Sequence, residues 1–448
     1  MAFGRFFVSN QSDIEIWDSF VGVSIVRRGP GVGMVKSIFN FVSLIIGGGM
    51  LCWPKLFKLC GWLGAIVCLC TICLFAETTM TLMVNCAIAY DTLSYEETCR
   101  AAFGPCGYYI VALACYLMEF GVLVTYWTAL EELTCPLLSE LGNHSQVVIK
   151  LSFAAIMLPF CYVRNLGQLP AWSYISCFLN MCVAVIIVAL SFENRPQGDI
   201  ETKAVNSEIW PSLGIIAFTF CNHDSVFTIY QNLKDASSER WGIVTKVCLW
   251  STVGLMLCTG LPIYLNLGTT VQVDITDNLG SSPTTQVLRA VMSVNLGMAW
   301  VYMQQVSRKY LHSLVMPCLR RRALGPDEVY EMSYGELVAF TTVQFGVTLL
   351  LAVYVPDLGW PMALTGLFAQ SITAFLIPPV LLWTTLRRGR DVGYNNIQLL
   401  WFFIVFLFGV LSCTLGSIKL MTTTPECHGH PIADGSGSCK CLEPQSTG

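Results

Sequence analysis

Long apolar stretches, separated by short polar segments, run along most of the chain. A helix needs roughly 20 mostly apolar residues to cross the hydrocarbon core of a bilayer. The segments between the stretches are too short for a soluble domain, so the pattern predicts an all-α integral membrane protein. We expect eleven membrane-spanning helices, at about residues 35–57, 62–84, 107–130, 147–163, 171–191, 211–231, 243–266, 287–306, 336–354, 360–384 and 397–419.

Composition agrees with this pattern. Hydrophobic residues make up 54% of the 448 residues and charged residues 12%, whereas a soluble domain carries about 25% charged residues. The opening segment MAFGRFFVSNQSDIEIWD lacks a basic region, an apolar core and a cleavage site in series, so we expect no signal peptide.

The distribution of basic residues indicates an orientation. With a cytoplasmic N-terminus, 17 of the 25 Lys and Arg residues fall on the cytoplasmic side, which is the usual bias of membrane proteins. We therefore expect a cytoplasmic tail (1–34), a membrane domain (35–420) and a non-cytoplasmic tail (421–448). The most basic segment, SRKYLHSLVMPCLRRRALGPDE, is interpreted as an anchor on anionic lipid rather than a nucleic-acid site, and no nucleic-acid partner is expected.

Two features of the non-cytoplasmic segments fit this orientation. Asn143 begins an Asn-His-Ser glycosylation sequon in a loop predicted to lie outside. The cysteines of the tail could pair in an oxidising compartment. Together with the two tail histidines they could instead bind zinc, but the spacing fits no common site, and we expect no metal. These tail residues are Cys427, His428, His430, Cys439 and Cys441.

The first predicted span is interrupted at its middle, where SLIIGGGMLCWPKLF contains three glycines and then a proline. A glycine inside a helix costs about 1 kcal/mol relative to alanine, and a proline about 3. Gly47, Gly48 and Gly49 therefore predict a break between Ile46 and Met50. We expect substrate contacts from Ile46, Gly47, Gly48, Gly49 and Met50, where the N–H groups that open the next half-helix would attract an anion such as a substrate carboxylate. The alternative is close helix packing through small residues.

The sixth predicted span, with the sequence AFTFCNHDSVFTIY, places a polar group at the centre of an apolar stretch. An ionisable residue at this depth is costly and normally faces a cavity, a partner or a proton path. A break here would free carbonyl groups for a cation or an amine. The alternative is a hydrogen-bonded pair that joins helices. We expect substrate contacts from Phe220, Cys221, Asn222 and Ser225, and ion or proton coupling through His223 and Asp224.

Further polar residues lie within other predicted spans. Glu77 in the second span and Glu119 in the third are candidate buried carboxylates. Three amides of the eighth span could line a site or join helices: Asn295, Gln304 and Gln305. The spans contain no metal-ligand spacing and no nucleophile motif, so an enzyme is not expected.

The two interrupted spans occupy matching positions if spans one to five and six to ten form two halves. Transporters built from inverted repeats bind substrate between such discontinuous helices, near the bilayer midplane. The pattern therefore predicts a 5+5 inverted repeat with broken first and sixth helices.

Four motifs in this order resemble the amino acid/auxin permease family: IGGGMLCWPKLFKLCGW, SYEETCRAAFG with YLMEFGVLVTYWTALEEL, AFTFCNHDSVFTIY, and VPDLGWPMALTG with IPPVLLW. The resemblance covers nearly all of residues 35–420 and is closest to the vacuolar-type members. It implies the broken-helix repeat fold, eleven spans and ion-coupled amino-acid transport.

The chain departs from the sodium-coupled members of that family. Ser43 stands where those members have an asparagine in the first span, and Gly297 or Ala299 falls where they have a hydroxyl group in the eighth. Asp224 replaces a residue that is usually uncharged. We therefore expect proton coupling through Asp224, His223 or Glu119, with sodium coupling as the alternative.

The sequence thus predicts a secondary active amino-acid transporter in a vacuolar, lysosomal or plasma membrane. Its expected partners are an amino acid and the bilayer, with no cofactor, and a monomer is favoured. An amino-acid sensor with little transport is a further alternative, which ligand-stabilised melting without flux would reveal.

Overall fold

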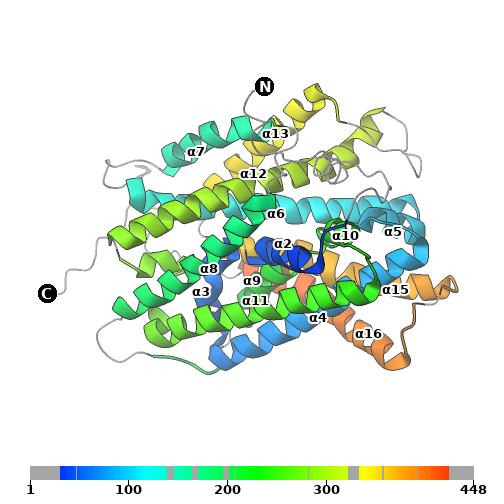
Figure 1. The fold of residues 1–448 in the computed structure, drawn as a ribbon, viewed down its shortest axis with the longest axis horizontal. Coiled ribbons are helices and arrows are strands. Elements are labelled where there is room, and N and C mark those ends of the chain that lie inside the picture. Colours follow the sequence, from blue (N-terminus) through cyan, green and yellow to red (C-terminus); the bar gives the residue numbers. More distant parts are fainter. Residues whose placement is uncertain are drawn as a thin grey trace.

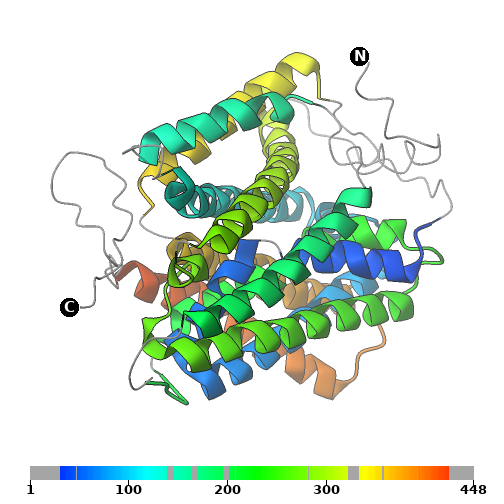
Figure 2. The ribbon, with the colours of Figure 1, turned by 60° about the vertical axis from the view of Figure 1, so that its left-hand side comes forward.

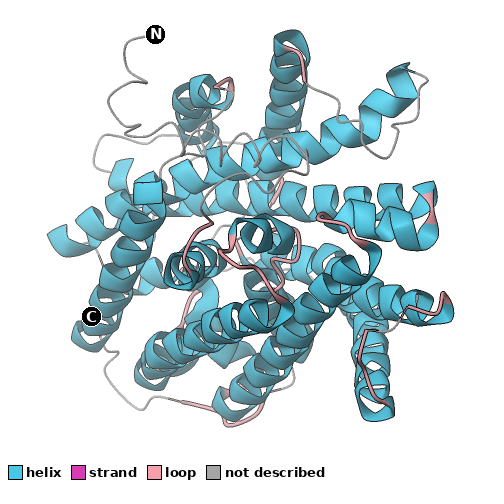
Figure 3. Ribbon diagram, turned by 45° about the vertical axis from the view of Figure 1, so that its right-hand side comes forward, coloured by secondary structure: helices cyan, strands magenta, loops and turns pink. Residues whose placement is uncertain are grey.

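The computed structural model describes residues 31–46, 48–138, 146–163, 170–194, 201–206, 208–280, 282–320, 332–355, 358–390 and 392–422. Within these ranges every regular element is a helix, as Figure 3 shows. The one extended pairing in this part of the chain is an isolated bridge between Val32 and Leu233. The prediction of an all-α protein is confirmed for the described residues.

Helices occupy each of the stretches predicted to span the membrane (Figure 1). The first half contains α2 (Met34–Ile46), η2 (Gly48–Cys52) and α3 (Trp53–Cys60), then α4 (Trp62–Tyr90), α6 (Pro105–Leu138), α7 (Gln146–Cys161) and α8 (Pro170–Glu193). The second half begins with α9 (Ile209–Phe220), α10 (Val226–Asn232), α11 (Ser238–Leu267), α12 (Pro283–Arg320) and α13 (Tyr334–Val353).

The last two stretches contain helices with wider turns. The tenth consists of α14 (Gly359–Thr365), η6 (Gly366–Gln370), η7 (Ile372–Leu376) and α15 (Ile377–Arg387). The eleventh consists of α16 (Asn396–Leu411), η8 (Ser412–Gly416) and α17 (Ser417–Thr422). The segments η6, η7 and η8 are π-helical.

Seven helices of the described part are long and apolar enough to cross a membrane, and the bent pair at the start of the chain makes eight. The helices Lys150–Cys161 and Ile209–Phe220 are apolar but shorter. The chain is therefore a multi-pass membrane protein, and the figure of eleven crossings stays a prediction.

One helix was not predicted. Helix α5 (Tyr95–Phe103) lies between α4 and α6. The Ser94 hydroxyl accepts a hydrogen bond from the backbone N–H of Glu97 at 3.1 Å, which caps the helix start. Ser followed three residues later by Glu is a known helix-start pattern, so the sequence did contain a signal for this element.

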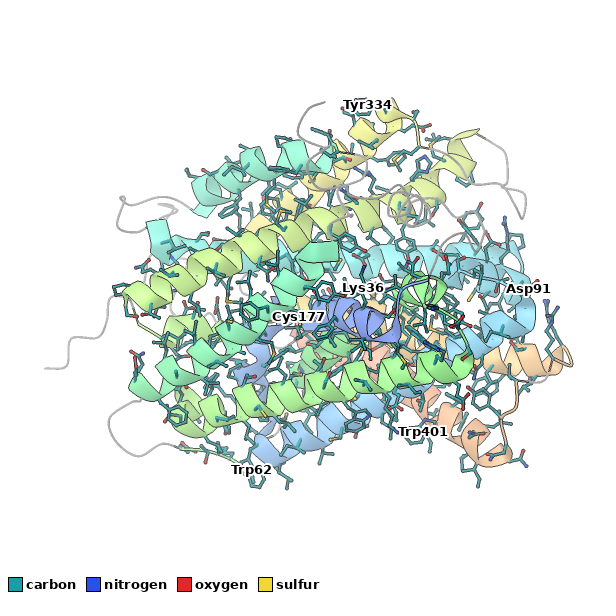
Figure 4. All side chains as sticks on the ribbon, viewed as in Figure 1. Lys36, Trp62, Asp91, Cys177, Tyr334 and Trp401 are labelled. Carbon is teal, nitrogen blue, oxygen red and sulfur yellow. The ribbon has the colours of Figure 1, made fainter. Side chains whose placement is uncertain are left out.

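The long helices run side by side along the molecule. In Figure 4, Trp62 and Asp91 mark opposite ends of α4, and α11 packs along α4. Helix α12 packs along α6, while α7 and α13 cover the far side of that pair (Figure 2). Helices α2 and α9 lie between these two layers (Figure 1). The ends of α2 and α9 at the interruptions, with Ile45, Ile46 and Phe220, are buried.

Two buried cationic side chains fasten the α6, α7, α12 and α13 group. Lys150 at the start of α7 forms a 2.6 Å ion pair with Glu131 and donates to the Ala352 carbonyl near the end of α13 at 2.6 Å. Arg308 of α12 donates to the Cys161 carbonyl at the end of α7 at 2.9 Å. Cations near helix C-termini are stabilising because the last carbonyl groups lack helical partners. The group therefore forms a braced scaffold beside the interrupted helices.

Candidate functional site

The first span is interrupted where the glycines predicted. Helix α2 ends at Ile46, and the axis turns by 55° before the segment Gly49–Cys60. Gly47 lies outside the described residues. Pro54 occupies the first turn of α3, where its missing N–H group costs nothing because that turn has no helical acceptor.

Gly49 also brings two helices together. A Cβ atom at this position would lie 3.1 Å from the Thr219 hydroxyl oxygen of α9, so a larger residue would force the segments apart. The glycine run is thus both interrupted and closely packed, and its role in binding a carboxylate stays a prediction. Consequently the interruption of the first span lies against the last turn of α9.

The second interruption separates α9, which ends at Phe220, from α10, which begins at Val226. A helix end leaves its last four carbonyl groups without helical partners. The Asn222 side chain donates to the Thr219 carbonyl at 2.9 Å, and Gln370 of η6 donates to the Phe218 carbonyl at 3.2 Å. Two amide side chains therefore cap the broken helix end.

His223 and Asp224 leave this interruption in different directions. His223 is fully buried, and its Nε2 lies 2.8 Å from the Thr79 hydroxyl of α4. Asp224 keeps part of its surface accessible to solvent and accepts a hydrogen bond from the Ser225 hydroxyl at 3.1 Å. The structure thus assigns His223 to a contact with the second span, while Asp224 faces elsewhere.

Asp224 lies beside Glu119 of α6, within reach of its carboxyl group. A hydrogen bond between the two groups would require a proton on one of them, because an ionised carboxylate only accepts hydrogen bonds. Glu119 is buried. None of the salt bridges formed by described residues includes either group. Two of the predicted titratable residues are therefore adjacent, and no described Lys or Arg side chain forms an ion pair with either of them.

The other predicted contact residues of the two breaks supply packing. Ile46, Met50, Phe220 and Cys221 are all buried. Ser43 is partly buried in α2, one turn before that helix ends. These side chains therefore contribute to packing, and substrate contacts at these positions stay a prediction.

The remaining polar candidates join helices. The Trp250 indole of α11 donates to Glu77 at 2.7 Å. Asn295 donates to Asn180 at 3.0 Å, Gln304 donates to the Thr341 carbonyl at 3.4 Å, and Gln305 donates to the Val163 carbonyl at 3.5 Å. Of the two readings of the α12 amides, interhelical bonding is the one that the structure displays.

Several candidates fall outside the described residues. These are Asn143 of the sequon and the tail residues Cys427, His428, His430, Cys439 and Cys441. Among the residues that the structure does describe, no group of three or more His, Cys, Asp or Glu residues is arranged to hold a metal ion.

Sequence reasoning did not single out Gln370 or Tyr95. Both donate hydrogen bonds to backbone carbonyl groups of distant helices. Gln370 is the one amide side chain in the apolar stretch 359–383, and a lone mid-span amide was an available signal.

The chain is similar to known transporters along most of its length. Residues 30–422 match a family described as "Transmembrane amino acid transporter protein". "Sodium-coupled neutral amino acid transporter 7" of Danio rerio is 23% identical over 417 residues, which cover 88% of this chain and 87% of that protein. "Amino acid transporter AVT6E" of Arabidopsis thaliana is 20% identical over 415 residues, covering 87% and 83%.

A solved structure agrees at the level of the fold. The chain superposes on a manganese transporter from Eremococcus coleocola with a TM-score of 0.51, over 87% of this chain and 86% of that one. The two sequences are 9% identical, so this likeness concerns the fold alone.

Proposed function

Because the chain belongs to the transmembrane amino acid transporter protein family, we propose that it is a secondary transporter that moves a small amino acid by alternating access. The family and the named relatives are transporters, so the chain is not an enzyme, and the resemblance drawn from the motifs is confirmed. The observation that carries the proposal is the contact between two helices that are each interrupted within the membrane domain.

The proposed architecture has eleven crossings and a 5+5 inverted repeat. Interrupted helices in the first and sixth positions support it. The scaffold supports it as well: Lys150 binds the end of α13 and Arg308 binds the end of α7, so the fourth and ninth spans are each held at their C-terminal end. Rocking of the interrupted helices against this scaffold would alternate access to the site.

The substrate would bind with its two charged ends on the two breaks. Its carboxylate would accept hydrogen bonds from the N–H groups that follow Gly49, where the positive end of a half-helix lies. Its ammonium group would donate to the backbone carbonyls of Phe220 and Cys221, which end α9, and to Asp224. Asn222 and Gln370 already occupy the carbonyls of Thr219 and Phe218, so the ligand would use the carbonyls that follow them.

Proton coupling would operate through Glu119 and Asp224. Their proximity supports this, because a hydrogen bond between the two carboxyl groups would hold a proton next to the proposed ammonium site. A ligand that binds the protonated and deprotonated pair differently shifts the balance between the two access states. His223 is placed in a structural contact with Thr79, which makes it the weaker candidate for coupling.

Sodium coupling is the second candidate, since the name of the Danio rerio relative describes a sodium-coupled transporter. Ser43 would then be the ligand of the first span. We favour the proton because the described site offers an unneutralised carboxyl pair.

We further propose the orientation that the basic residues predict, with the N-terminus in the cytoplasm and the tail 421–448 in the lumen or outside the cell. A vacuolar, lysosomal or plasma membrane suits this arrangement. A monomer bound to lipid, without a cofactor, is the proposed form.

Uptake of radiolabelled amino acids into proteoliposomes tests the function. A panel of neutral, cationic and anionic amino acids would be offered under a proton gradient and, separately, a sodium gradient, with protein-free liposomes as control. We expect a neutral amino acid to accumulate under the proton gradient and the gain to vanish with a protonophore. Absence of transport for the whole panel would contradict the proposal.

A further inference from the structure

The tenth span departs from α-helical geometry beside the break of the sixth. Its segments η6 and η7 are π-helical, and such wider turns often occur at functional sites. Gln370 is the last residue of η6 and is 1% exposed. A buried amide in a widened helical segment points to a role beyond packing.

The amide of Gln370 is oriented by its partner. Its Nε2 donates to the Phe218 carbonyl at 3.2 Å, whereas the opposite orientation would place two acceptor oxygens together. In a continuous helix the backbone N–H of Asn222 would donate a hydrogen bond to the Phe218 carbonyl. That bond is not formed here, because α9 ends at Phe220. Gln370 thus supplies the hydrogen bond that the interruption removes.

The reach of Gln370 is set by a backbone contact. Gly366 of η6 packs on Gly214 of α9 so closely that a Cβ atom on Gly366 would collide with the Gly214 carbonyl oxygen. The two helices therefore have no room to slide toward each other, and a shorter side chain at position 370 would leave the Phe218 carbonyl unpaired.

The same widened span is tied to the other half of the sixth span. The Tyr95 hydroxyl of α5 donates to the Thr373 carbonyl of η7 at 2.7 Å. The Tyr95 ring stacks on Phe227 of α10, with ring centroids 6.2 Å apart. Consequently both halves of the sixth span are connected to the widened span. Gln370 connects α9 to η6, and Tyr95 connects α10 to η7.

We propose that Gln370 is a positioning residue for the proposed transport reaction. It holds the end of α9 so that the carbonyls of Phe220 and Cys221 meet the substrate ammonium group at a fixed distance. Gln370 acts through Phe218 and does not touch the substrate. The inference rests on the proposed function, which it deepens by naming what sets the geometry of the ammonium site.

The test compares variants in the proteoliposome assay, with KM and the maximal rate measured for each. Gln370→Leu removes the donor, and Gln370→Asn keeps an amide that is one methylene too short. Both are expected to raise KM about tenfold, the scale of one lost buried hydrogen bond. Gln370→Glu, whose neutral carboxyl can donate to the same carbonyl, is expected to return KM to within about threefold of the wild type at acidic pH.

A matched control and a second readout separate positioning from packing. Gln344 is an equally buried glutamine of α13 that bonds to Gln304 at 3.3 Å within the scaffold, so Gln344→Leu is expected to leave KM unchanged. Hydrogen exchange of residues 221–226 is expected to rise in Gln370→Leu and Gln370→Asn, but not in Gln344→Leu.

The failure of this inference is distinguishable from failure of the proposed function. Absence of transport by the wild type overturns the proposed function. The hydrogen-exchange measurement would still show whether Gln370 protects residues 221–226 at the broken helix end. A wild type that transports, together with an unchanged KM and unchanged exchange in Gln370→Asn, overturns the role of Gln370. If Gln370→Leu does not fold, Gln370→Asn and Gln370→Glu decide the question.

Discussion

Glu119 of α6 and Asp224 of the sixth-span break lie close enough for their carboxyl groups to interact, although they are far apart in the sequence. This contact joins the scaffold helices to the segment that would move against them. A proton held there would therefore act at the interface between the two parts.

Replacing Asp224 by Asn is expected to abolish the dependence of uptake on the pH gradient. The neutral amide removes the titrating member of the pair but keeps the size of the side chain. Rates of uptake measured with and without the gradient check this. Glu77→Gln is the matched control. Glu77 of α4 accepts a hydrogen bond from Trp250 of α11 and is not part of the Glu119–Asp224 pair, so this variant should leave the pH dependence intact.

Replacing Thr79 by Val is expected to lower stability and spare coupling. The change leaves Nε2 of the buried His223 without its partner, which costs about 1 to 3 kcal/mol. A lower melting temperature in detergent, with the pH dependence of uptake retained, is the expected result. Loss of the pH dependence in a folded Thr79→Val protein would instead place the coupling proton on His223.

The loop between α11 and α12 is expected to close more firmly as the pH falls. Partial burial raises the pKa of Asp277, whose side chain is 36% exposed, from 3.8 to about 7. The charge of Asp274 adds to this, while Arg289 opposes it. The closed loop thus binds the proton more tightly than an open one. Its stability should be lowest and constant above pH 7, and should rise as the pH falls toward 4.

Hydrogen exchange of residues 271–280, corrected for the intrinsic effect of pH, measures this closure. Protection is expected to be higher at pH 5 than at pH 8, and Asp277→Asn should remove most of the difference. Equal protection at the two pH values in the wild type would contradict the assignment. The loop matters for the site because η5 (Ile275–Asn278) contacts η2 of the first span.

Replacing Lys150 by Met is expected to destabilise the scaffold by about 3 to 5 kcal/mol, because it leaves the buried Glu131 without its ion-pair partner. The double variant Lys150→Met with Glu131→Leu should recover much of the loss, since both members of the ion pair are then removed. Melting temperatures of the single and double variants check this. A double variant no more stable than Lys150→Met would show that the Ala352 contact dominates.

The apolar pattern was enough to place helices in every predicted stretch, because burial in lipid leaves the backbone few other solutions. The two interruptions could also be predicted, from the glycines of the first span and from the polar residues of the sixth. Helix α5 was not predicted, although Ser94 and Glu97 form a helix-start pattern. The search for long apolar stretches does not detect a short polar helix.

The side-chain contacts of the site could not be predicted from the sequence. His223 and Asp224 lie in an unwound segment, where no helical period relates their directions, so only the fold assigns one to α4 and the other to α6. Gln370 reaches α9 from a π-helical segment whose Gly366 packs closely on Gly214, and no local sequence period encodes that contact between distant helices.

The central claim, that an amino acid binds between the two interrupted helices, is tested most directly by counterflow of a radiolabelled amino acid in proteoliposomes containing wild type or Gly49→Leu. A leucine at this position would push η2 away from Thr219. We predict that the wild type accumulates label and that a folded Gly49→Leu protein accumulates none above protein-free liposomes. Equal accumulation by the two proteins would contradict the account.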